Sequence, residues 1–230
     1  MLLENTEQNQ GLPHTMFKIL NRPISKLRRD LLKAFPSADT ADLKKNLKLI
    51  PSTNHQKAAM NFDAVLVIDV QKHFCDPAQA RGTKDTDKIA KHIANTVPAF
   101  RKAGWPIYNI YFSHEDVARD YIDFHHYAPE ETDITHAKYR ASAFDGEHGG
   151  AFAAQLKARG HQHLLLVGFN TSACIAETVQ DAQKLGFQCA IAVDAIGNDK
   201  TINTPQHVTL KALIQNHNCT LTTSLHALRI

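Results

Sequence analysis

Two side chains that can do chemistry follow patterns of buried strands in the sequence. Asp69 lies at the end of the apolar run AVLVIDV (64–70), and Cys174 follows the run HLLLVGF (163–169) through the short segment NTSA. In an open sheet of parallel strands, functional side chains collect beyond the carboxyl ends of the strands. The sequence therefore predicts that Asp69 and Cys174 belong to a functional site at that edge of a sheet.

Cys174 stands where a helix is expected to begin. The free N–H groups and the dipole of a helix N-terminus favour thiolate over thiol, and the same N–H groups can stabilise an oxyanion. A thiolate nucleophile also needs a proton acceptor and a positive charge, for which Asp69 and Lys138, in the polar segment THAKYRASAF, are the candidates. The alternative interpretation is a buried structural cysteine and a solvated loop lysine. Cys189 and Cys219 lie in strand-like runs and are expected to be structural.

From Phe62 onwards, short apolar runs alternate with helical patterns, which is typical of βαβ units around a mainly parallel sheet. The runs are rich in Val, Ile, Leu and Thr, as buried strands are. The sequence thus predicts an α/β fold. The long polar connection 113–149 is expected to be functional or to contain short elements that periodicity does not reveal. The predicted strands are 64–70, 107–112, 163–169, 188–195 and 219–224, and the predicted helices are 86–104, 150–160, 174–186 and 204–217.

The first 60 residues differ from the rest in charge. They carry 10 Lys and Arg against 5 Asp and Glu, whereas residues 61–230 carry 16 against 18. Two amphipathic segments, 24–35 and 41–50, are predicted to be short helices between proline-containing turns. We expect a basic, partly helical N-terminal extension (1–60) that packs on the body (61–230) or on a neighbouring subunit. Its charge is compatible with a solvated surface or with an acidic partner.

The overall composition excludes several classes of protein. Of the 230 residues, 43% are hydrophobic and 21% are charged, which is typical of a globular protein and not of a fibrous or disordered one. The four cysteines lack CxxC spacing, and no apolar run has the length of a membrane span. The start of the sequence lacks the pattern of a secretion signal, so a cytoplasmic location is expected. The glycine cluster GEHGG (146–150) matches no phosphate-binding loop, so we expect no nucleotide cofactor. A nucleic-acid partner is not expected either.

Three separated motifs, in the same order along the chain, resemble those of one known family. They are Asp69-Val70-Gln71 with Phe74, Lys138 with Ser142-Ala143-Phe144, and the run Gly168-Phe169-Asn170-Thr171-Ser172-Ala173-Cys174 followed by Gly186 and Val193-Asp194-Ala195. Over about residues 62–226, the sequence resembles the isochorismatase-like cysteine hydrolases, which include nicotinamidases and N-carbamoylsarcosine amidohydrolases. The resemblance implies a three-layer αβα, Rossmann-like fold with a mainly parallel sheet of six strands.

The same resemblance implies a catalytic triad of Asp69, Lys138 and Cys174. In the implied mechanism, Asp69 accepts the thiol proton, Lys138 stabilises the charges, and Cys174 attacks an amide-type carbonyl to form an acyl-enzyme. A cis peptide bond precedes the nucleophile in this family, and the oxyanion hole is expected from the backbone N–H groups of Ala173 and Cys174.

Two further residues of the first motif, Gln71 and Phe74, are implied to help build the substrate pocket, with Phe74 as an apolar wall. Both also fit a structural interpretation, Gln71 as a polar residue at a strand end and Phe74 as a core aromatic. The sequence leaves the two interpretations open.

Nicotinamidases of this family carry a zinc site built from an Asp-x-His just after the second strand and a further His downstream. The segment Asp123-Phe124-His125 has that form, but it lies about ten residues beyond the expected place. The next histidine, His136, stands closer to Lys138 than the zinc pattern has it. We therefore expect no metal and no other cofactor, with these histidines solvated in the loop.

Because Cys174 and Lys138 are both present, the sequence predicts hydrolysis of a C–N bond in a small amide, carbamoyl or ureido compound. Family members that hydrolyse a vinyl ether use the Asp, and several lack the cysteine, so this activity is the first alternative. A binding protein whose basic extension recruits an acidic partner is the second. Members of the family are often dimers or tetramers, so a homo-oligomer is expected.

Overall fold

A computed structural model describes residues 40–50, 62–113 and 123–228 of the chain. Its described part contains one sheet of six parallel strands in the order β3-β2-β1-β4-β5-β6, as the resemblance implied. The strands are β1 (Ala64–Ile68), β2 (Ile107–Phe112), β3 (Ile134–Lys138), β4 (His163–Phe169), β5 (Gln188–Gly197) and β6 (Thr220–Thr222).

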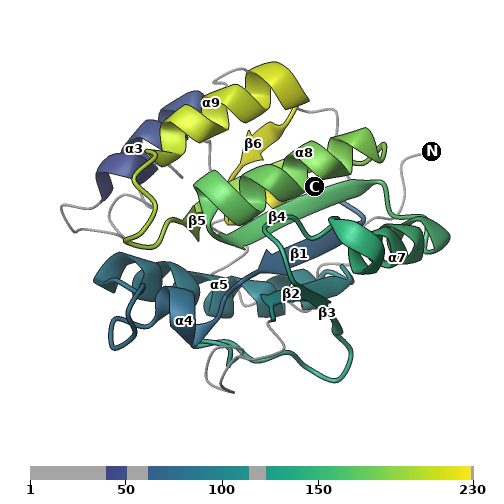
Figure 1. Cartoon of the computed structure of the whole chain (residues 1–230), viewed down its shortest axis with the longest axis horizontal. Coiled ribbons are helices and arrows are strands. Elements are labelled where there is room, and N and C mark those ends of the chain that lie inside the picture. The colour runs from purple at the N-terminus through teal and green to yellow at the C-terminus, as the bar shows by residue number, and fades with distance from the viewer. Residues whose placement is uncertain (1–39, 51–61, 114–122, 229–230) are drawn as a thin grey trace, which may run out of the picture.

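Helices cover both faces of the sheet, which confirms the prediction of three layers (Figure 1). One face carries α3 (Thr40–Leu49), α7 (Gly146–Ala158), α8 (Ala176–Lys184) and α9 (Gln206–His217). The other face carries α5 (Lys84–Lys102) with the short helices α4 (Lys72–Cys75) and α10 (Ser224–Ala227). None of the described helices combines the length and the apolar character needed to cross a membrane.

The central strands are apolar throughout because both of their faces are buried. In β1, Leu66 and Ile68 belong to the core under α7, α8 and α9, whereas Val65 and Val67 belong to the core under α5. All four are 0% exposed. A strand buried on both faces reads as a continuous apolar run, which is why the sequence revealed it.

The strand β3 was not predicted from the sequence pattern, which placed its residues in a polar loop. Its sequence, ITHAK, is mostly half-buried or exposed, because it forms an edge of the sheet and pairs with β2 alone. Lys138 is therefore the last residue of a strand and not a loop residue. The structure thus fixes the position of this lysine relative to the other strand ends.

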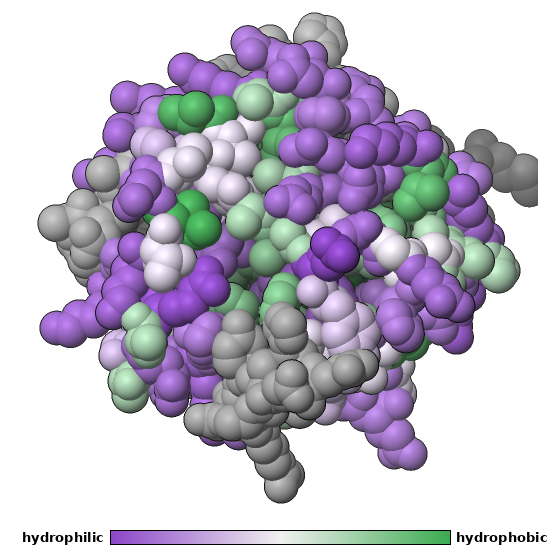
Figure 2. Space-filling model, in the orientation of Figure 1, coloured by the Kyte–Doolittle hydropathy of each residue, from purple (hydrophilic) through white to green (hydrophobic). Residues whose placement is uncertain are grey.

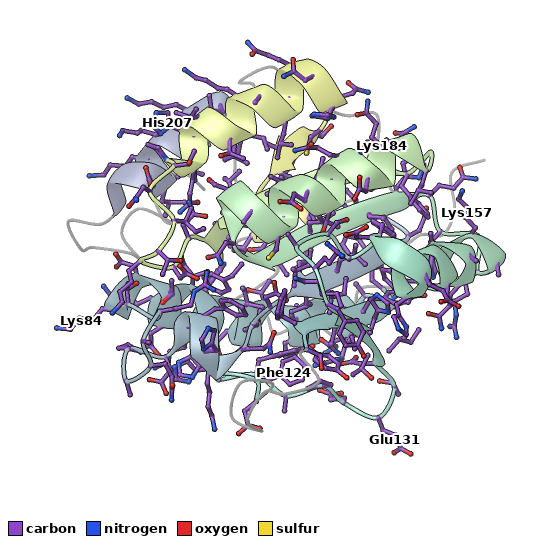
Figure 3. The ribbon with its side chains drawn as sticks, in the orientation of Figure 1. Lys84, Phe124, Glu131, Lys157, Lys184 and His207 are labelled. Atoms are coloured by element: carbon purple, nitrogen blue, oxygen red, sulfur yellow. The ribbon has the colours of Figure 1, made fainter. Side chains whose placement is uncertain are left out.

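The described part of the N-terminal extension is the helix α3, close to the predicted helix 41–50. Its residues Leu47 and Ile50 are 2% and 3% exposed and belong to the same core as the sheet. Asp42 lies 3.8 Å from His207, which Figure 3 labels at the start of α9, next to α3. The predicted helix 24–35 lies outside the described residues, and the domain boundary at residue 60 stays a prediction.

The face seen in Figure 2 is mostly hydrophilic, with apolar residues in small separate patches. Among the described residues, the large apolar side chains that are exposed are Tyr139, Val208 and Ile214. The predicted homo-oligomer stays a prediction, since these side chains do not by themselves define an interface.

The strand order reverses between β1 and β4, and Gly168 lets these two strands approach closely at that point. Gly168 pairs with Ile68 in the parallel register and has φ +120°. A Cβ atom on Gly168 would lie 1.9 Å from the carbonyl oxygen of Ile68. Only glycine fits at this position. Its partner in the neighbouring strand, Ile68, is the residue directly before Asp69. The crevice at such a reversal is where α/β folds place their functional sites.

We expect Gly168→Ala to lower the free energy of unfolding by more than about 3 kcal/mol, because a backbone clash is added to the strain of the positive φ. Gly160→Ala is the matched control, since Gly160 has φ +78° and nothing within 4 Å of a built Cβ. The control is expected to cost about 1 kcal/mol. Urea unfolding of both variants measures the difference, and equal costs would contradict the close-packing argument.

Candidate active site

Asp69 and Lys138 form an ion pair at the carboxyl edge of the sheet. The Lys138 Nζ lies 2.9 Å from the Asp69 Oδ2, and the two side chains are 2% and 0% exposed. Asp69 directly follows β1 and has φ +53°, a left-handed conformation that is uncommon for residues other than glycine. The pair is thus buried, and an unusual backbone conformation positions its carboxylate.

Lys138 reaches Asp69 from a strand two places away in the sheet. With neighbouring strands about 4.8 Å apart, β3 lies roughly 10 Å from β1, a gap that only a long side chain can bridge. Lys138 is in register with Phe112 at the end of β2, and its Nζ lies 4.7 Å from the centre of the Phe112 ring. The Nζ also donates to the Arg140 carbonyl oxygen at 3.1 Å. The lysine therefore crosses β2 over an aromatic ring.

Cys174 completes the cluster from the other side of the strand reversal. It lies in the π-helical turn Thr171–Ile175, between β4 and α8, and is 7% exposed. Its thiol lies close enough to both side chains of the ion pair for their charges to affect its pKa. The structure thus brings together the three residues that the sequence singled out.

Burial and charge set the protonation of this cluster. Burial raises the pKa of Asp69, an effect that the charge and hydrogen bond of Lys138 reduce without cancelling. Burial alone would lower the pKa of Lys138, but attraction to Asp69 and Cys174 outweighs it, so the pKa is raised and the ammonium is charged. A carboxylate, an ammonium and a neutral thiol together carry no net charge.

The thiol of Cys174 departs from the sequence prediction of a favoured thiolate. Burial raises its pKa to about 12, and the negative charge of Asp69 adds to this effect, while Lys138 opposes it. The helix α8 begins after Ile175, so Cys174 does not occupy the helix start that the prediction assumed. The resting nucleophile is a thiol that must pass its proton to a neighbour before it can attack.

Polar contacts fix the loop that carries the nucleophile. The Phe169–Asn170 peptide bond is cis, four residues before Cys174 in the sequence. The Asn170 side chain donates to the Asp199 carboxylate at 3.0 Å and accepts from the Asp199 N–H at 2.7 Å. Asp199 in turn pairs with Arg81 at 2.7 Å. The sequence did not reveal Asp199 as a partner, because it lies far from Asn170 along the chain.

The backbone N–H groups around the thiol differ in what they contact. The N–H of Ala173, predicted as an oxyanion donor, donates to the Asn170 carbonyl oxygen at 3.1 Å. Burial raises the pKa of Cys174, whereas an interaction with the Asn170 backbone lowers it. The Asn170 backbone therefore lies near the reacting sulfur. The predicted roles of Ala173 and Cys174 in an oxyanion hole stay predictions.

Gln71 and Phe74 occupy buried positions beside the ion pair. The Gln71 Oε1 accepts from the Phe112 N–H at 2.7 Å, and its Nε2 donates to the Phe112 carbonyl oxygen at 3.0 Å. Phe74 is 3% exposed, with the Arg81 guanidinium 4.9 Å from its ring centre. Gln71 therefore positions the aromatic ring that Lys138 crosses. Their predicted contact with substrate stays a prediction.

The described histidines near the site do not fit the nicotinamidase zinc pattern. Asp123 pairs with Lys72 at 3.1 Å, and His125 contacts Asp87 at 2.7 Å. His136 stacks on Phe152, with ring centres 4.2 Å apart, and its Nε2 contacts the Ala143 carbonyl oxygen. These side chains have other partners and do not converge on the ion pair.

We expect the alkylation rate of Cys174 by iodoacetamide to rise about tenfold per pH unit from pH 7 to pH 10, because only the thiolate reacts. A pKa of about 12 leaves no plateau in this range. Mass mapping of the labelled peptide at each pH measures the rate. In the control, urea-denatured protein, the rate is expected to level off above about pH 9, near the ordinary thiol pKa of about 8.5. A plateau below pH 9 in the folded protein would contradict the raised pKa.

The parallel α/β sheet places buried aspartate, lysine and cysteine side chains at its strand reversal, where doubly wound α/β proteins place their functional sites. Residues 63–224 match the family model of the isochorismatase domain. This match covers more than half of the chain, and the chain therefore belongs to the isochorismatase family of hydrolases.

Several solved structures have the same fold. Pyrazinamidase of Pyrococcus horikoshii, in complex with zinc, is 20% identical over 70% of this chain and 98% of that chain, with a TM-score of 0.60. A cysteine hydrolase from Pseudomonas syringae is 21% identical over 72% and 90%, with a TM-score of 0.62. An isochorismatase-like hydrolase from Alkaliphilus metalliredigens is 19% identical over 72% and 96%, with a TM-score of 0.63.

Proposed function

We propose that this protein is a cysteine hydrolase that cleaves a C–N bond in a small amide, carbamoyl or ureido compound. The observation that carries the proposal is the buried cluster in which the Cys174 thiol interacts electrostatically with both members of the 2.9 Å ion pair of Asp69 and Lys138. A nucleophile, a proton acceptor and a fixed positive charge are the three groups that acyl transfer through a thiol requires.

In the first half of the reaction, the proton of the Cys174 thiol passes to the Asp69 carboxylate as the sulfur attacks the carbonyl carbon. The transfer moves negative charge from oxygen to sulfur within the site, so no additional charge is buried. Lys138 interacts with the charges of both groups and stabilises the charge in either place. The carbonyl π electrons move to oxygen and form a tetrahedral oxyanion.

The oxyanion needs hydrogen-bond donors within about 3 Å of where it forms. The Asn170 backbone interacts with the Cys174 sulfur, and a tetrahedral carbon would be one bond away from that sulfur. We assign the Asn170 N–H as one donor, with the Cys174 N–H as the second. The Ala173 N–H would first have to release the Asn170 carbonyl.

In the second half, the oxyanion collapses, the C–N bond breaks, and the leaving nitrogen takes the proton from Asp69. This step releases ammonia or an amine and leaves a thioester on Cys174. Water then attacks the thioester while Asp69 accepts one of its protons. Collapse of this second intermediate releases the acid, and the proton returns to the sulfur. Asp69 therefore serves as base and acid in turn, for which a raised carboxyl pKa is suited.

A small-molecule substrate is the class on which the family acts. We also propose that the protein is cytoplasmic, that it forms a homo-oligomer and that its reaction needs no catalytic cofactor. Vinyl ether hydrolysis, the alternative, requires protonation by Asp69 and no nucleophilic sulfur, and the cysteine therefore separates the two activities.

The test is ammonia release from a panel of primary amides, carbamoyl compounds and ureido compounds. For any compound that is turned over, we expect Cys174→Ala to lower kcat/KM at least about 1,000-fold, because the covalent route is lost. The control is Cys219→Ala, which removes another buried thiol, 4% exposed, between α9 and β6. This variant is expected to keep its activity.

Undiminished ammonia release by Cys174→Ala would overturn the mechanism. A vinyl ether substrate that releases its keto acid equally with wild type and Cys174→Ala would support the alternative activity. Amide turnover that is lost in Cys174→Ala and kept in Cys219→Ala is the result that supports C–N cleavage through the thiol.

A further inference from the structure

A group of metal-ligating side chains lies outside the catalytic cluster, on the face of the sheet that α5 covers. It consists of Asp87, in the first turn of α5, and the adjacent histidines His125 and His126, in the connection that leads to β3. The Nε2 atoms of both histidines lie 2.7 Å from the Oδ1 of Asp87. One ligand atom from each of the three residues lies within 4.8 Å of the others.

The backbone at His126 explains how two neighbouring residues can point the same way. Successive side chains in an extended chain point to opposite sides. His126 instead has φ +55°, in the left-handed region, and its ring centre lies 4.1 Å from that of His125. A left-handed conformation is uncommon for residues other than glycine, and its appearance here turns both imidazoles towards one carboxylate oxygen.

Both segments that supply ligands are fixed to the body of the protein. The connection is anchored to the end of β1, because the His125 N–H donates to the Val70 carbonyl at 3.0 Å and the Lys72 N–H donates to the Asp123 carbonyl at 2.8 Å. Between these contacts, Phe124 forms a bridge with Gln71. Figure 3 labels Phe124 in this connection and Lys84 at the first residue of α5, both in the lower half of the view.

The start of α5 is held in place by its own cap. The Thr83 hydroxyl accepts from the Thr86 N–H at 3.1 Å, and the Thr86 hydroxyl accepts from the Thr83 N–H at 2.8 Å. This reciprocal capping fixes the first helical turn, which carries Asp87. Ligands on anchored elements need little ordering when an ion binds.

Charge and exposure at the group suit a cation. Asp87 offers a negatively charged oxygen ligand that both imidazoles already contact. The side chains are 33% exposed at Asp87, 11% at His125 and 37% at His126. An ion could therefore enter from solvent and keep water in its remaining positions.

We propose that Asp87, His125 and His126 bind a divalent transition-metal ion of the zinc type. Two imidazole nitrogens and one carboxylate oxygen form a ligand set that zinc accepts, with the fourth position open to water. Asp87 and His126 lie outside the Asp-x-His pattern of nicotinamidases, and no member of the catalytic cluster takes part. The ion would tie the connection to α5 and so support the end of β1, which makes its role structural.

The experiment titrates the chelator-treated full-length protein with Zn²⁺ by calorimetry and follows Co²⁺ binding by its visible absorption. We expect wild type to bind one equivalent of metal. His126→Asn removes a ligand and keeps a residue that tolerates the left-handed backbone, and we expect it to weaken binding at least about 100-fold. Asp87→Ala, on the other element, is expected to weaken binding similarly.

The matched control is His148→Asn, which removes an exposed histidine on α7. It should bind Zn²⁺ as wild type does, and it controls for the 14 histidines of the chain. Zn²⁺ should also raise the Tm of wild type and of this control, but not that of His126→Asn, because only the native state presents the site. Unchanged Zn²⁺ binding in His126→Asn and Asp87→Ala would overturn the proposal. The lack of a saturable Zn²⁺ site in wild type would also overturn it, and the three side chains would then form only a hydrogen-bonded cluster.

Discussion

The ion pair between Asp69 and Lys138 is the constraint on which the rest of the site depends. A carboxylate with no exposed surface is stable in its charged form only if a cation and hydrogen bonds replace the lost water. Lys138 supplies that cation from the edge of the sheet, and this requires β3 to pair in parallel with β2 at one particular register. Both polar atoms of the Gln71 side chain bond the backbone of Phe112, and the ring of Phe112 provides the surface that the lysine crosses.

The same pair determines what Cys174 can do. With the carboxylate beside it, the buried thiol keeps its proton, and its pKa is raised to about 12. Transfer of the proton to Asp69 has the lowest free-energy cost, since it leaves the total charge of the buried cluster unchanged. The site is therefore built for a proton transfer coupled to attack, and not for a thiolate that is present at rest. The contacts of Asn170 with Asp199 keep the sulfur within reach of the pair.

Much of the fold could be predicted, because strands buried on both faces leave continuous apolar runs in the sequence. Asp69 and Cys174 could be placed at the functional edge for the same reason, since each follows such a run. The edge strand β3 could not be predicted from its pattern, because ITHAK has one strand neighbour and little apolar burial. Lys138 was therefore placed by resemblance and not by spacing.

The features that depend on burial or on distant partners could not be predicted. A high thiol pKa results from desolvation, which the sequence does not display, and a helix start at Cys174 suggested the opposite. The group of Asp87, His125 and His126 joins two segments far apart in the chain. The Asp-x-His form of residues 123–125 indicated His125 as a candidate ligand, but it did not indicate Asp87 or His126.

The most direct test of this account is a double-mutant cycle on the free energy of unfolding, with Asp69→Asn, Lys138→Met and the two combined. Asparagine suits the left-handed backbone at Asp69, so the cycle isolates the loss of charge. We expect each single variant to leave one buried group unpaired. The double variant should therefore lose less free energy of unfolding than the two single variants lose together, by at least about 2 kcal/mol. The exposed pair of Lys72 and Asp123, 3.1 Å apart, is the control and should couple by less than about 1 kcal/mol. Additive losses at Asp69 and Lys138 would contradict the claim that their buried pairing organises the site.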